Sequence, residues 1–308
     1  MSALHDRLKE YLALRRALGF TLERAGRLLA QLVDFCDEAG IEVVTVEAAL
    51  SWATSPVRCS PLWGANRLCV ARGFLRYLHA LDPRTGVPPT GLLPGGSKRA
   101  TPYLYTPEQV VALTTAARAI HSPLRAASME AVIGLLACTG MRVGEALALD
   151  RADVDLHQGV VTVRKAKFDK TRAVPLHPTA TAALVAYARR RDELAPAASS
   201  PAFFVSATGT RILYCNFHLG FHELVCRAGI EPRSSSCRPR PHDLRHTFAV
   251  TALARFQAEG ADVAVKLPVL STYLGHVDPA ATYWYLSGSI EVLAVAAGRL
   301  ETTYGARP

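Results

Sequence analysis

The sequence lacks the long apolar stretches that mark membrane or secreted proteins. No run of about 18 apolar residues occurs, so no membrane span is expected. The first residues, MSALHDRLKEYLALRR, carry scattered charges and no apolar segment followed by a small-residue cleavage site. A signal peptide is therefore not predicted, and the cytosol is the expected compartment.

Cysteine pairs and acidic clusters are also missing. The seven cysteines are odd in number and widely spaced, and no CxxC pair occurs. This pattern favours neither a disulfide framework nor a zinc site. No group of Asp and Glu has the spacing of metal ligands. We therefore expect no metal and no cofactor.

Positive charge is in excess and is unevenly distributed. The net charge is +9; residues 1–95 hold 11 basic and 9 acidic residues (+2), and residues 96–308 hold 24 and 17 (+7). A basic excess suits a polyanionic partner, because each Lys or Arg placed at a phosphate releases counterions. An arginine-rich composition inherited from the genome would give the same excess, so charge alone leaves the partner open.

Apolar periodicity predicts a helical first domain and a mixed second one. Residues 1–85 show four stretches with apolar side chains three and four positions apart, which predicts a small helical bundle. Residues 86–104 form the expected linker, which overlaps a stretch (82–102) that contains five prolines and four glycines. Residues 105–308 form the second domain.

The second domain is predicted to combine helices with one β-hairpin. Thr106 and Pro107 have the character of an N-cap and a first helical residue. Two β-branched runs, 159–163 and 172–176, flank a charged turn and predict the hairpin. Further helices are expected at about 127–138, 178–194, 214–228, 242–257, 262–274 and 290–300. The fold class is therefore mainly α with a small antiparallel β-sheet (α+β).

Four short segments could carry chemistry. They are Thr-Gly-Met-Arg-Val-Gly-Glu at 139–145, the basic hairpin turn at 164–172, Pro-His-Asp-Leu-Arg-His at 241–246, and the Gly-His and Tyr-Trp-Tyr segment at 275–285. Each has an ordinary reading by itself: a surface ion pair, a solvated turn, a structural histidine or an aromatic core. Arg142 and Glu145, three apart, share one helix face, as do His242 and Arg245. A His and an Arg at a helix N-terminus are suited to an anion.

Together, and in this order, the four segments resemble those of the tyrosine recombinase (phage integrase) family. The resemblance covers residues 105–300, and the helical first domain looks like the family's core-binding domain. The form Tyr-Trp-Tyr-Leu-Ser is similar to transposon-borne members, whereas Ala-Lys-Phe in the hairpin turn departs from the common Gly-Lys-Gly. The catalytic residues that the resemblance implies are Arg142, Lys167, His242, Arg245, His276 and Tyr285, with Glu145 in support.

The resemblance implies a transesterification at a DNA phosphate. Tyr285, nine positions after the family's His, would attack and form a 3′-phosphotyrosyl link without ATP or metal; Tyr283 is the alternative two residues away. Two guanidiniums can bridge the phosphate oxygens with forked donors. Lys167 would protonate the leaving 5′-oxygen. His242 would accept the tyrosine proton or donate to the phosphate, and His276 would hydrogen-bond the phosphate.

The family also implies a specific double-stranded DNA site and a homo-tetramer on it, with sister recombinases as further partners and the nucleoid as the location. The stripe of Ile290, Leu293, Ala294, Ala297 and Leu300 could dock on a neighbouring subunit or on its own domain. Further DNA contacts are expected from Arg67, Arg72, Arg76, Lys98, Arg99, Lys170 and Arg172, the first three facing outward. The role would be integration or transposition. A DNA-relaxing type IB topoisomerase and a non-cleaving DNA-binding protein are the alternatives.

Overall fold

The computed structural model describes residues 2–56, 60–94, 100–166, 170–196 and 200–275, without the side chains of residues 165, 166 and 170. The chain divides into two compact units, Met1–Arg99 and Ala100–Pro308. No helix among the described residues is long and apolar enough to cross a membrane. The mainly helical α+β class predicted from the sequence is confirmed.

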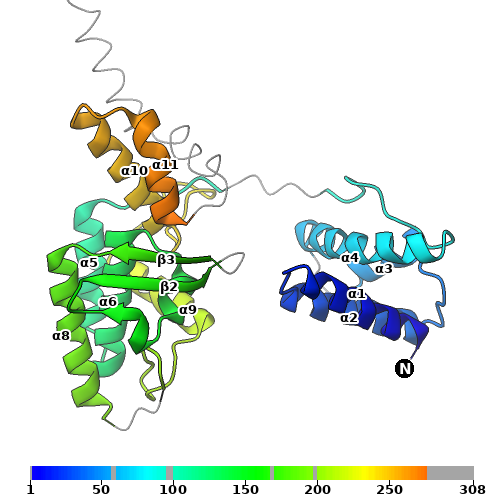
Figure 1. Ribbon diagram of the computed structural model, residues 1–308, viewed down its shortest axis with the longest axis horizontal. Helices are drawn as coiled ribbons and strands as arrows, with labels where there is room; N and C mark the ends of the chain where they lie inside the picture. Colours follow the sequence, from blue (N-terminus) through cyan, green and yellow to red (C-terminus); the bar gives the residue numbers. More distant parts are fainter. Residues whose placement is uncertain (1, 57–59, 95–99, 167–169, 197–199, 276–308) are drawn as a thin grey trace, which may run out of the picture. The chain divides into compact units, whose positions relative to one another are not determined.

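The first unit is a bundle of four helices (Figure 1). They are α1 (Ala3–Ala17), α2 (Glu23–Glu38), α3 (Val46–Thr54) and α4 (Pro61–Leu81). Their apolar faces meet around the buried side chains of Trp52 and Phe74. Thr45 caps α3 by accepting a hydrogen bond from the Ala48 backbone N–H at 3.2 Å, which satisfies a backbone donor at the start of this helix.

The outward direction predicted for three α4 arginines is correct for only one of them. Arg67 is 6% exposed, and its guanidinium lies 4.1 Å above the centre of the Trp52 ring, so the prediction for this residue is wrong. Arg72 is partly buried and donates to the carbonyl oxygens of Pro88 and Pro89. Arg76 is exposed.

The two ends of the predicted linker 86–104 pack on different units. The Gly86 N–H donates to the Val44 carbonyl at 2.8 Å, and Leu93 packs against the core of the first unit. Tyr103 is buried in the core of the second unit. Both ends of the Pro- and Gly-rich stretch are therefore anchored, each within its own unit.

The second unit places helices around a three-stranded antiparallel sheet in the order β1-β2-β3. The sheet consists of β1 (Val154–Asp155), β2 (Val160–Ala166) and β3 (Lys170–Pro175), preceded by a short 3-10 helix, η1 (Arg151–Asp153). Val161 pairs with Val174, and both are fully buried, so one face of the predicted hairpin covers the core.

Helices make up the rest of the second unit. They are α5 (Pro107–Arg118), α6 (Pro123–Thr139), α7 (Val143–Ala148), α8 (Pro178–Leu194), α9 (Tyr214–Arg227), α10 (Asp243–Ala258) and α11 (Val263–Leu274). Helix α6 is nearly apolar and contacts α5, α7, α8, α9 and α10. The last two helices pack on each other at one end of the unit, where they form a small core of their own (Figure 1). The C-terminal ends of α6 and α11 lie near the start of α10, because Arg245 bonds to both.

Candidate active site

Arg142 lies in a tight connection between two helices. Helix α6 ends at Gly140, which has a left-handed φ of +61°, and α7 begins directly after Arg142. The Glu145 carboxylate accepts hydrogen bonds from the Arg142 backbone N–H at 3.0 Å and from Nη1 at 2.8 Å. Nη2 of Arg142 donates to the Gly275 carbonyl at 3.2 Å. The arginine is thus oriented at two points while 34% of its side chain stays exposed.

Glu145 is shared between two arginines. Arg172 on β3 donates a bidentate pair of hydrogen bonds to the same carboxylate, from Nη1 to Oε1 at 3.1 Å and from Nη2 to Oε2 at 2.7 Å. Burial by itself would raise the pKa of Glu145, but the hydrogen bonds and charges of Arg172 and Arg142 lower it to about 2. This carboxylate is therefore ionised at neutral pH.

Arg245 is a buried arginine held by the ends of two helices. Only 1% of it is exposed. Its Nη1 donates to the Gly140 carbonyl at 2.8 Å and its Nη2 to the Leu274 carbonyl at 2.9 Å. Both carbonyls lie at helix C-termini, where the backbone carries partial negative charge. The Arg245 guanidinium is therefore bound by backbone carbonyl oxygens at the ends of α6 and α11.

His242 stands among guanidiniums at the start of α10. Desolvation by the surrounding residues, followed by the positive charges of Arg245, Arg142 and Arg240, lowers its pKa to about 4. Part of the side chain is exposed, so solvent opposes this shift. The imidazole is neutral at neutral pH, and a neutral imidazole can accept a proton.

The loop before His242 is held by a buried carboxylate. Asp243 is fully buried and accepts from the Arg240 backbone N–H and Nε, both at 3.0 Å, and from Nη2 at 2.8 Å. Burial raises the pKa of Asp243, although Arg240 opposes that shift. Arg240 was not among the residues predicted from the sequence. The pattern Arg-x-x-Asp at a helix start could have identified it.

The structure thus brings together the predicted Arg142, Glu145, His242 and Arg245, and adds Arg172. Four guanidiniums (142, 172, 240 and 245) and two carboxylates (145 and 243) give this cluster a formal charge of 4 − 2 = +2. Such a cluster is suited to a phosphate diester. The predicted residues Lys98, Arg99, Lys167, His276, Tyr283 and Tyr285 lie outside the described residues, as does the side chain of Lys170.

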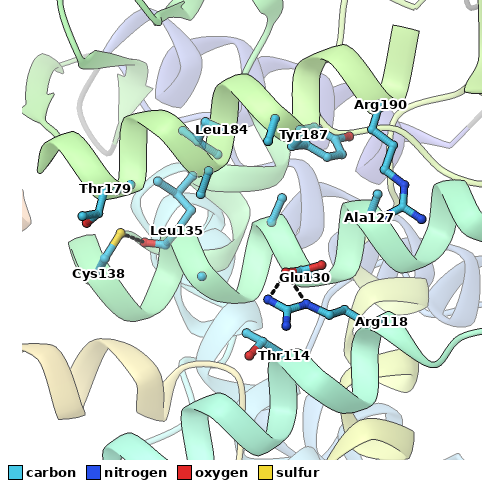
Figure 2. A pocket seen from close by; sticks show the side chains of 15 residues that line it. Thr114, Arg118, Ala127, Glu130, Leu135, Cys138, Thr179, Leu184, Tyr187 and Arg190 are labelled. Atoms are coloured by element: carbon cyan, nitrogen blue, oxygen red, sulfur yellow. Dashed lines mark hydrogen bonds and ion pairs between the residues drawn. The ribbon is translucent and has the colours of Figure 1, made fainter. Parts of the chain in front are cut away.

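A separate groove of about 510 Å³ runs between α5, α6 and α8. Figure 2 shows its mostly apolar lining, including Leu135, Cys138 and Leu184, with the ion pair of Arg118 and Glu130 beside them. Arg142, His242 and Arg245, the predicted catalytic residues that the structure describes, do not line this groove. The candidate active site is therefore the cationic cluster at the ends of α6 and α11 and the start of α10, and not this groove.

Comparisons with known proteins identify the family of the chain. The model of the phage integrase family matches residues 104–290. The chain is 42% identical to “Putative integrase/recombinase y4rB” of Sinorhizobium fredii (strain NBRC 101917 / NGR234), covering 98% of both chains. It is 35% identical to tyrosine recombinase XerD of Rhizobium meliloti (strain 1021), over 72% of this chain and 68% of that one.

Solved structures show the same fold. The integrase of transposon Tn1549, determined with transposon right end DNA, superposes with a TM-score of 0.62 at 17% identity, covering 96% of this chain and 98% of that chain. XerA recombinase gives a TM-score of 0.53 at 23% identity, covering 98% and 100%. The family match and these folds define the class: an enzyme that breaks and rejoins DNA strands. The chain belongs to the phage integrase family, the tyrosine recombinases.

Proposed function

We propose that this chain is a site-specific recombinase that cleaves DNA through a 3′-phosphotyrosyl link formed by Tyr285, with no need for ATP or a divalent metal. The observation that carries the proposal is the set of Arg142, His242 and Arg245, which three separate helix ends bring together. Two arginines and a neutral histidine around one point match what a phosphoryl transfer without a metal requires.

The arginines stabilise the transition state. A phosphodiester carries one negative charge and gathers a second as the tyrosine oxygen attacks. Arg142 and Arg245 neutralise that charge, because each guanidinium is a permanent cation with planar, forked N–H donors that match phosphate oxygens. Loss of one such donor costs a factor of roughly 10²–10³ in rate.

Proton transfer falls to three residues. His242, neutral at neutral pH, accepts the proton of the Tyr285 hydroxyl or donates to the phosphate. Lys167 in the hairpin turn protonates the leaving 5′-oxygen, and His276 hydrogen-bonds the phosphate. These last two assignments rest on the family's sequence pattern, as does that of Tyr285.

Capture of the covalent intermediate tests the chemistry. The substrate is a nicked duplex, chosen by binding from fragments of the DNA that flanks the gene. We expect the wild-type chain and Tyr283→Phe to form a covalent adduct in the presence of a chelator, and Tyr285→Phe to form none. An adduct with Tyr285→Phe but not with Tyr283→Phe would reassign the nucleophile. Strict dependence on a divalent metal would refute the mechanism.

The biological role follows from the relatives. We propose that the chain integrates or transposes a mobile element as a homo-tetramer on two DNA sites, alone or with sister recombinases. The solved relatives include the Tn1549 transposon integrase with transposon end DNA and a lambda integrase tetramer on a Holliday junction, which supports this role. A two-site recombination assay tests it. Relaxation of supercoils by a monomer, without recombination, would instead favour a topoisomerase.

The C-terminal stripe from Ile290 to Leu300 is the proposed tetramer contact. Deletion of residues 288–308 is expected to abolish DNA-bound tetramers while leaving DNA-bound monomers. Tetramers that survive the deletion would remove this part of the proposal.

A further inference from the structure

Arg172 lies where the β-hairpin, the start of α7 and the end of α11 meet. Its side chain is only 12% exposed, although it belongs to the basic hairpin that was expected to contact DNA. Three of its N–H donors have partners within the protein: the fork to Glu145, and Nε to the Tyr273 carbonyl at 3.1 Å. These three bonds tie Arg172 to Glu145 and to the end of α11.

The contacts of Arg172 close a ring that contains Arg142. Arg172 holds Glu145, Glu145 holds the backbone and guanidinium of Arg142, and Arg142 donates to the Gly275 carbonyl. Gly275 in turn packs flat against Arg172: a Cβ added there would lie 2.6 Å from Nη1 and 2.8 Å from Cζ. Each member of the ring limits the movement of the next.

The ring also adjoins two other proposed catalytic positions. Lys167 precedes β3 in the same hairpin, and His276 follows Gly275 directly in the sequence. Arg172 lies on β3, the strand that follows the turn with Lys167. It packs against Gly275, the residue before His276, and it is linked to Arg142 through Glu145.

We propose that Arg172 is a positioning residue for strand cleavage, which aims Arg142 at the scissile phosphate and offsets the charge of Glu145. This inference rests on the proposed function. Without Arg172, the negative charge of Glu145 is balanced by Arg142 alone, so this pair presents no net charge to the incoming phosphate. With Arg172, the three side chains together keep a charge of +1 (two cations less one anion).

Lysine cannot replace this arginine. One ammonium has no planar fork to match both oxygens of Glu145 and no additional Nε donor for the Tyr273 carbonyl. Arg172→Lys keeps the charge and removes the geometry, which makes it the discriminating variant. The matched control is Arg118→Lys, at the end of α5. Arg118 also pairs with a carboxylate, Glu130, but its side chain is 62% exposed and lines the separate groove between α5, α6 and α8.

The experiment measures DNA affinity and the single-turnover rate of adduct formation on the nicked duplex described above. We expect Arg172→Lys to lower the rate at saturating DNA on the order of 10- to 100-fold, with the Kd for DNA within about two-fold of wild type. Arg118→Lys should leave both unchanged. Thermal unfolding of each variant confirms that the fold persists.

A second measurement separates positioning from simple structural support. The charged groups facing Glu145 are Arg142 on its own helix start and Arg172 on β3, and α11 adds the Tyr273 carbonyl against Arg172. In Arg172→Gln the pKa of Glu145 should rise, because its fork is lost. Cleavage by this variant should then depend on pH between 7 and 5 more steeply than cleavage by wild type, because protonation of Glu145 removes both the carboxylate that orients Arg142 and the charge that opposes it. Adding Glu145→Gln should abolish that extra pH dependence.

The outcomes are distinct. An Arg172→Lys variant that cleaves at the wild-type rate overturns the inference and leaves the proposed function standing. A variant that loses DNA affinity at an unchanged rate also overturns it, in favour of a direct phosphate contact. A wild-type chain that forms no adduct overturns both proposals.

Discussion

Gly140→Ala tests whether the turn after α6 controls the site. The glycine has a left-handed φ of +61°, and a Cβ there would lie 2.5 Å from Cδ1 of Phe248 and 3.0 Å from Cδ2 of Leu274. The left-handed backbone costs about 1–2 kcal/mol for alanine, and overpacking against two side chains adds about 1–3 kcal/mol. The expected loss in the free energy of unfolding is therefore about 2–5 kcal/mol.

The substitution should also affect catalysis, because the Gly140 carbonyl holds Arg245. Urea denaturation followed by circular dichroism gives the stability, and hydrogen exchange resolves peptides of α6 and α10 from those of α2 and α4, which serve as an internal reference. Adduct formation on the nicked duplex should fall along with protection in α6 and α10.

Gly134→Ala is the matched control on the same helix. No atom lies within 4 Å of the added Cβ, and the position is helical, so a gain of about 0.5–1 kcal/mol is expected. Ordinary surface substitutions change the free energy of unfolding by up to about 0.5 kcal/mol. If the free energy of unfolding of Gly140→Ala lies within about 0.5 kcal/mol of wild type, the steric reasoning is wrong.

Three further predictions concern individual side chains. The lowered pKa of Glu145 contributes stability that is present above about pH 4.5 and lost toward pH 2. Wild type should therefore lose more stability than Glu145→Gln between pH 5 and pH 2.5. Urea denaturation at these two pH values should show a difference of roughly 2–3 kcal/mol between the two losses. An NMR titration of the DNA-free chain should find His242 neutral at pH 6, and a midpoint above 6.5 would contradict the arginine cluster. Arg67→Ala should destabilise the first unit by about 1–3 kcal/mol through lost contact with Trp52, whereas Arg76→Ala should leave unfolding unchanged and reduce the salt dependence of DNA binding.

Local patterns were enough to predict most of the fold. The helices 178–194 and 262–274 agree with the structure within one residue and the hairpin strands within three, because apolar spacing and caps are local signals. The pairing of Arg142 with Glu145 was equally local, since three residues on a helix start determine it. The prediction for Arg67 was wrong because a charged side chain was assumed to face solvent. Position 67 precedes the buried Phe74 by seven residues and therefore lies on the same face of the helix.

The contacts that assemble the site could not be predicted in this way. Arg245 is bound by carbonyls 105 and 29 residues away, and Arg172 by a carboxylate 27 residues away. No periodicity encodes such pairs, because they depend on where whole helices end in space. The motifs identified which residues matter, while their partners were visible only in three dimensions.

The carbonyl clamp on Arg245 also has a consequence during protein synthesis. One of its two carbonyls belongs to Leu274, the last residue of α11, so the clamp is incomplete until the ribosome has added that residue. Nascent or truncated chains that end before it have Arg142, His242 and Arg245 in sequence but leave Arg245 without its second anchor. Such chains also lack Tyr285, so they cannot form the proposed covalent link in any case. We therefore expect the missing clamp to appear as lower hydrogen-exchange protection of α10, and a chain that stops at residue 260, compared with the full chain, provides the test.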